Sequence, residues 1–60
     1  MSAINVSDRV RIVSAKSPKE QAWVNKVGVV VMIADGTRCV IAFPDQSAAT
    51  VEIDQLVKVG

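Results

Sequence analysis

Apolar and polar residues alternate with a period of two along much of the chain, which is the pattern of half-buried β-strands. The longest such region is residues 26–43, where two runs rich in β-branched residues flank Asp35-Gly36. An Asp-Gly pair between such runs favours a β-hairpin, because a type I′ turn requires positive φ at both central residues and these residue types tolerate it. We therefore expect a central hairpin around which shorter strands are arranged.

Shorter strands are predicted on both sides of this hairpin. From Arg9 onward, arginine and apolar side chains alternate, so a first strand is expected to begin there. Pro44 ends the return strand of the hairpin, because proline cannot continue a central ladder. Residues 49–53 then alternate as a fourth strand, residues 54–56 are expected to form a single helical turn, and residues 57–59 a last short strand.

The connection between the first strand and the hairpin, residues 14–25, is polar and shows no sustained period. Connections near about 12 residues without structure of their own are usually functional or mobile, so a binding surface is expected here. Ser17 followed by Pro18 is also a start signal for a single helical turn. Five short strands, a long first connection and a helical turn before the last strand predict one all-β domain over residues 1–60, a small five-stranded SH3-like barrel.

The alternation within the hairpin also predicts which side chains face the core. One face is assigned inward: Val29, Val31, Ile33, Cys39, Ile41 and Phe43. The other face forms a second apolar surface: Val30, Met32, Val40 and Ala42. Leaving these side chains in water forgoes about 25 cal/mol per Å² of apolar area, so we expect a partner protein or a second copy of the chain to cover them. Gly28, within the first hairpin strand, indicates a bulge or a sharp bend.

Composition restricts the function. The chain has no histidine and one cysteine, Cys39, so an internal disulfide is excluded and the usual zinc ligands and general acid–base groups are missing. Seven Lys and Arg against six Asp and Glu give a net charge of +1, which does not favour nucleic acid. No apolar run approaches the ~18 residues of a membrane span, and no signal peptide is evident. We expect a soluble, cytoplasmic protein that is not an enzyme and holds no metal or cofactor.

Basic side chains and the single tryptophan are the candidates for binding a partner. Cations attract acidic proteins through salt-sensitive steering, and Trp is enriched among interface anchors. The candidates are Arg9, Arg11, Lys16, Lys19, Trp23, Lys26 and Arg38. The cations are also compatible with ordinary solvated positions, and Trp23 with packing over one end of the barrel. Glu52 and Asp54 would make an acidic spot, which alone is not a catalytic pair.

Four segments together resemble a known family: Ser7–Val13, Trp23–Val30, Val40–Phe43 and Ile53–Val59. Their layout resembles the electron-transport accessory proteins, a group that includes the photosystem I subunit PsaE, the variable chain of ferredoxin–thioredoxin reductase and the SH3-like subunit of the photosynthetic NADH dehydrogenase-like complex. The stretch Trp23-x-Asn25-x-x-Gly28-x-Val30 is similar to the start of the second PsaE strand. The resemblance implies a cofactor-free docking or accessory subunit of an electron-transfer complex, which holds a ferredoxin-like partner through basic side chains.

Two other resemblances imply different functions. Residues Lys26–Val31 are similar to a KOW element, the strand-and-glycine motif of ribosomal and transcription-elongation barrels, which implies RNA or protein binding. A surface that binds nucleic acid usually combines clustered Lys and Arg side chains with aromatic rings that stack on the bases. This chain has only one Trp, one Phe and no Tyr. The layout is also similar to the oligomeric type II dihydrofolate reductase. In this chain, Glu52 and Asp54 stand where the family's pore motif has a glutamine and a tyrosine, so reductase activity is not expected.

Overall fold

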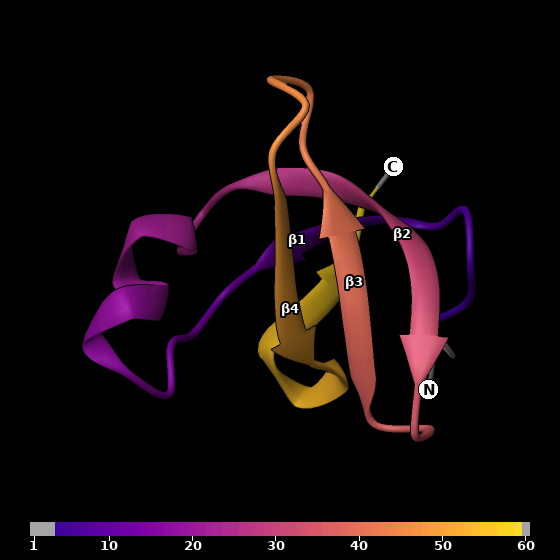
Figure 1. Cartoon of the computed structure of the whole chain (residues 1–60), viewed down its shortest axis with the longest axis horizontal. Helices are drawn as coiled ribbons and strands as arrows, with labels where there is room; N and C mark the ends of the chain where they lie inside the picture. Colours follow the sequence, from indigo (N-terminus) through magenta and orange to yellow (C-terminus); the bar gives the residue numbers. More distant parts are fainter. Residues whose placement is uncertain (1–3, 60) are drawn as a thin grey trace.

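The computed structural model describes residues 4–59, which form one antiparallel sheet of five strands and two short 3₁₀ helices (Figure 1). The elements are β1 (Arg9–Ile12), η1 (Pro18–Trp23), β2 (Val27–Ala34), β3 (Arg38–Ala42), β4 (Ala48–Glu52), η2 (Ile53–Gln55) and β5 (Leu56–Lys58). Across the sheet their order is β4-β3-β2-β1-β5. The predicted all-β fold, with five strands and a helical turn before the last one, is confirmed. The two end strands, β4 and β5, do not pair with each other. The sheet therefore does not close into a full barrel.

The central hairpin forms at the predicted place. Asp35 and Gly36 have positive φ values of 55° and 73°, the backbone conformation for which an Asp-Gly pair is suited. Ala34 pairs with Arg38, so Asp35, Gly36 and Thr37 together make the connection, which is one residue longer than a two-residue type I′ loop. The turn chemistry was therefore predicted correctly, whereas the loop length was not.

A β-bulge interrupts β2. The pairing with β3 shifts between Val30 and Met32, so Val31 is an extra residue on this strand. The bulge therefore lies beyond Gly28, the residue at which the sequence predicts it, and the shift begins two residues later. Because side chains along a strand alternate with a period of two, one extra residue exchanges the two faces beyond it.

The bulge makes the predicted faces of β2 wrong in the middle of the strand. Val30 was assigned to the outer surface, but it is 1% exposed and belongs to the core. Val29 and Val31 were assigned to the core, but they are 40% and 49% exposed. Beyond the bulge the assignments are correct, since Ile33 packs against the core and Met32 is exposed.

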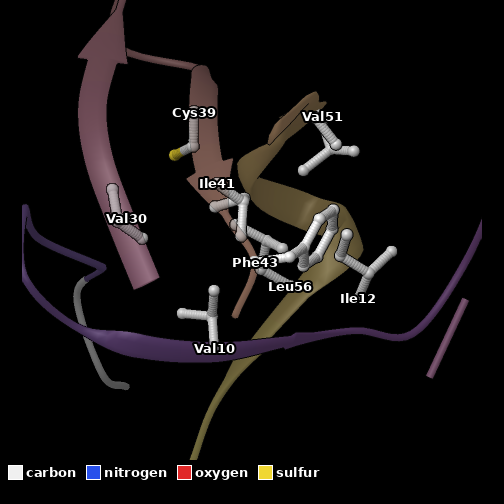
Figure 2. Packing of buried hydrophobic residues seen from close by; sticks show 9 residues of the cluster. Val10, Ile12, Val30, Cys39, Ile41, Phe43, Val51 and Leu56 are labelled. Atoms are coloured by element: carbon white, nitrogen blue, oxygen red, sulfur yellow. The ribbon is translucent and has the colours of Figure 1, made fainter. Parts of the chain in front are cut away.

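All five strands contribute to a single core. It consists of Val10, Ile12, Val30, Cys39, Ile41, Phe43, Ala49, Val51 and Leu56. Figure 2 shows these side chains gathered around Ile41 and Phe43. The three inward positions predicted for the return strand of the hairpin, Cys39, Ile41 and Phe43, are all buried. The core therefore follows the predicted alternation on β3 and departs from it only on the bulged strand.

Gly28 lies at a close approach between β2 and β3. A Cβ atom at this position would lie 2.6 Å from the carbonyl oxygen of Ala42 and 2.6 Å from Cγ2 of Ile41. On its other side Gly28 pairs with Val10 of β1. The glycine is therefore required because the site has no room for a side chain.

The long first connection contains η1, which lies to the side of the sheet (Figure 1). The helix begins at Pro18, after Ser17 with an extended backbone, so the predicted start signal is confirmed. It runs to Trp23, further than the single turn expected, and none of its residues is fully buried. Trp23, the last residue of η1, packs against the core, and polar contacts hold the rest of the helix.

Candidate functional site

A groove lies between η1 and the outer edge of β4, the two segments seen at the left and centre of Figure 1. It consists of two hollows of about 540 Å³ and about 240 Å³, which adjoin, since Glu20 and Thr50 line both. The first is also lined by Ser17, Lys19, Trp23, Ala48 and Ala49, and the second by Lys16, Arg38, Val51, Glu52 and Gln55. The groove therefore gathers four of the predicted partner-binding residues: Lys16, Lys19, Trp23 and Arg38.

Gln55 joins the two walls of this groove. Its side chain is 1% exposed, and a buried amide must have its hydrogen bonds satisfied. Its Nε2 donates to the carbonyl oxygen of Ser14 at 3.0 Å and to Oε1 of Glu20 at 2.7 Å. Its Oε1 accepts a bond from the backbone N–H of Glu52 at 2.9 Å. This one side chain therefore holds the first connection against the end of β4.

Glu20 completes the network on the side of η1. Its Oε1 also accepts a hydrogen bond from the backbone N–H of Lys16 at 3.0 Å. Bonds to a carboxylate favour the charged form. The pKa of Glu20 is accordingly lowered, first by the Lys16 N–H and then by the Gln55 amide. Glu20 is thus used in holding the groove together.

Replacing Glu20 with glutamine is expected to lower stability near neutral pH and to have a shrinking effect in acid. Because the pKa of Glu20 is lowered from its ordinary value of 4.5, the ionised carboxylate contributes stability that is fully present above that pH. This contribution is lost as the pH falls through the folded-state pKa. Thermal unfolding of both proteins from neutral pH into acid measures the difference in Tm.

The matched control for this experiment is Asp35→Asn, which removes a carboxylate at the hairpin turn, where Asp35 is exposed. We expect the Tm difference of Glu20→Gln to shrink in acid much more than that of the control. A Tm difference for Glu20→Gln that stays the same across the whole pH range would contradict a stabilising role for the ionised carboxylate.

Lys16 is engaged within the protein. Its Nζ lies 3.0 Å from a carboxylate oxygen of Asp54 and 3.3 Å from one of Glu52. These acidic partners raise the pKa of Lys16, with the hydrogen bond to Asp54 as the largest cause. All three side chains are partly exposed, so the pairs add little stability. They do occupy Lys16, which the sequence had suggested as a contact to a partner.

Lys19 and Arg38 are the other cations that line the groove. Within residues 4–59, neither forms an ion pair. Trp23, in the same groove, is half-buried and packs against the core. It therefore fits both readings of the sequence, since it covers the edge of the core and also lines the first hollow.

The remaining predicted cations lie elsewhere. Arg9 and Arg11 are exposed on β1, beside Val29 of β2 and Val57 of β5 respectively. Lys26 lies over the ring of Phe43, with its Nζ 5.3 Å from the ring centroid, a cation–π geometry. The seven predicted residues thus do not form one patch, because only those of the first connection and Arg38 share the groove.

Apolar side chains also remain on the outer surface of β2 and β3. We call this set the outer apolar face: Val29, Val31, Met32, Val40 and Ala42. Met32 pairs with Val40 and Val29 with Ala42, so the members are neighbours across the two strands. Three of the four residues predicted for this surface are present, whereas Val30 is in the core.

The reactive chemistry of the described part of the chain is limited. Cys39 is fully buried, and burial raises the pKa of its thiol, which keeps it protonated and unreactive. In residues 4–59 no group of three or more His, Cys, Asp or Glu side chains is placed to hold a metal ion. Over the same range, no helix has the length and apolar character needed to cross a membrane. The groove is therefore notable for one aromatic side chain, Trp23, and for two cations without an ion pair in the described residues, Lys19 and Arg38.

Sequence reasoning missed Gln55 and the backbone edge of β4 as parts of this site. The signal for Gln55 was weak, namely a long amide side chain directly before the apolar run that starts at Leu56. Comparison with known proteins adds no assignment: no protein-family model, no curated protein and no solved structure matches this chain.

Proposed function

We propose that this protein is a non-enzymatic docking module of the SH3-like kind, which holds an acidic partner protein in the groove between η1 and β4. The supporting observation is that two cations without an ion pair in residues 4–59 lie in adjoining hollows: Lys19 lines the larger one together with Trp23, and Arg38 lines the smaller one. Such cations steer an acidic partner toward the site, and a half-buried tryptophan provides a rigid anchor. The resemblance to electron-transport accessory proteins suggests the partner class, an acidic ferredoxin-like protein.

The architecture of the groove suits this role. Its acidic residues are already used within the protein, since Glu20 accepts bonds from Gln55 and Lys16, and Glu52 pairs with Lys16. Two cations of the lining, Lys19 and Arg38, form no ion pair within residues 4–59. Both hollows are open to solvent, which favours contact with a protein surface over enclosure of a small substrate.

Titration of the ¹⁵N-labelled protein with an acidic plant-type [2Fe–2S] ferredoxin tests this proposal. We expect amide shifts to change at Lys19, Arg38 and Thr50 and at the indole of Trp23, with an affinity that falls as salt is added. The double substitution Lys19→Glu with Arg38→Glu is expected to weaken binding by about tenfold or more. The double substitution Arg9→Glu with Arg11→Glu, which reverses two exposed charges on β1, is the matched control and is expected to have a much smaller effect.

Two results would contradict docking in the groove: no ferredoxin binding at low salt, or shift changes confined to β1 and the outer apolar face.

The same sample titrated with mixed-sequence RNA and DNA addresses the KOW-type alternative, which predicts steeply salt-dependent binding. Sedimentation equilibrium addresses the reductase-like alternative, since that family resemblance implies a stable oligomer in which the outer apolar face is covered.

A further inference from the structure

The outer edge of β4 borders the groove. β4 is an end strand of the sheet, and only its inner edge pairs with β3. Beyond the end of the strand, the Ile53 N–H donates to the carbonyl oxygen of Thr37 at 2.7 Å, which continues the ladder. Bonded pairs of an antiparallel ladder recur at every second residue. The backbone groups of Val51 and Ala49 therefore point toward β3.

The backbone groups of the alternate residues point the other way, into the groove. The N–H of Glu52 is already bonded to the Gln55 side chain. For Ala48 and Thr50, no hydrogen bond on this edge is formed by any part of the chain between residues 4 and 59. Both residues line the groove, so it presents a short row of backbone donors and acceptors without partners.

Natural edge strands are usually protected by lysine, proline, a bulge or very short length. The opposite end strand follows this rule, because β5 has three residues and carries Lys58, which is paired with Asp8 at 3.4 Å. β4 has five residues, Ala-Ala-Thr-Val-Glu, with no lysine or proline, and its register with β3 is unbroken. At about 3.4 Å per residue, β4 is about 17 Å long, and the part of its edge without partners is the stretch from Ala48 to Thr50.

We propose that an extended segment of the partner protein adds to the sheet along the outer edge of β4, pairing with the backbone of Ala48 and Thr50. Acidic side chains of that segment contact Lys19 and Arg38, and an apolar side chain packs on Trp23. Main-chain hydrogen bonds would supply affinity, as in other cases of strand addition. The side chains of Lys19, Arg38 and Trp23 would supply specificity. This inference rests on the proposed docking function and names the form of the partner.

The test uses a blocked peptide, Thr-Glu-Val-Thr-Val-Glu-Thr, whose two glutamates lie on the same face of an extended chain. Binding is followed by Trp23 fluorescence and by amide hydrogen exchange. We expect slowed exchange at Thr50 and Ala48. We also expect Thr50→Pro to weaken binding by about tenfold or more, because it removes the N–H that faces the groove. This substitution spares the bonds to β3, and proline is tolerated at such an edge position.

Thr50→Val is the matched control, since it changes the side chain but keeps the backbone N–H, and binding should be retained. If Thr50→Pro fails to fold, the same peptide N-methylated at alternate amides removes the pairing from the ligand's side, and its binding should be lost. The strand-addition proposal is overturned if the N-methylated peptide binds as well as the parent, or if folded Thr50→Pro binds with unchanged affinity.

The two proposals fail in different ways. Ferredoxin docking that persists in Thr50→Pro would overturn strand addition and leave the docking function in place. Peptide binding that depends on the Thr50 N–H, without any ferredoxin binding, would support strand addition and overturn the assignment of the partner as ferredoxin-like.

Discussion

Val30→Lys is expected to unfold the protein, whereas Val31→Lys, at the next residue of the same strand, is expected to leave it folded. Val30 is 1% exposed within the core, so a lysine there would place an unpaired charge among apolar side chains. Such a burial costs several kcal/mol, which is comparable with the total stability of about 5 kcal/mol expected for a small domain. Val31 lies at the bulge and is 49% exposed, so its lysine remains in water.

Far-UV circular dichroism and urea unfolding of the two variants measure this difference. Val30→Ala serves as a milder control, with an expected loss of about 2 kcal/mol from the cavity that it leaves. If Val30→Lys folds normally while Val31→Lys does not, β2 has the register that simple alternation predicts, and the bulge is wrong.

Gly28→Ala is expected to be the second most damaging change. Its methyl group would lie 2.6 Å from the backbone oxygen of Ala42, which cannot move without shifting β3. Overpacking of this kind costs about 1–3 kcal/mol, and a backbone contact places the cost toward the upper end. Urea unfolding at a fixed temperature gives the change in the free energy of unfolding.

Gly36→Ala is the matched control, because it introduces the same methyl group where no atom lies within 4 Å. Its cost comes from the positive φ of 73° alone and is expected to be about 1 kcal/mol. A loss for Gly28→Ala no greater than that for Gly36→Ala would show that the contact between β2 and β3 is looser than described.

Local signals account for the parts of the fold that were predictable. The Asp35-Gly36 turn, the start of η1 at Pro18 and the end of the hairpin at Pro44 each depend on the backbone preferences of one or two residues. The bulge at Val31 had no such signal. It lies in a run of valines and methionine, where moving the register by one residue exchanges one apolar side chain for another. Hydrophobic patterning specifies register only where the two faces differ in polarity.

The candidate site was predictable by residue type but not by arrangement. Lysine, arginine and tryptophan are reasonable interface candidates from sequence, and Lys19, Trp23 and Arg38 do share a groove. Whether a cation is free depends on contacts across the fold, as in Lys16, which bonds to Asp54, a residue 38 positions away. Neither composition nor periodicity carries information about such a pair.

Gln55 also has a consequence for the order in which the protein is assembled. Its side chain bonds to Ser14 and Glu20, which precede it by 41 and 35 residues. During synthesis, η1 is made long before the residue that anchors it, and contacts that close long loops form late because of their entropic cost. The groove is therefore completed only after Gln55 has left the ribosome, so a nascent chain that ends earlier presents no finished surface to a partner.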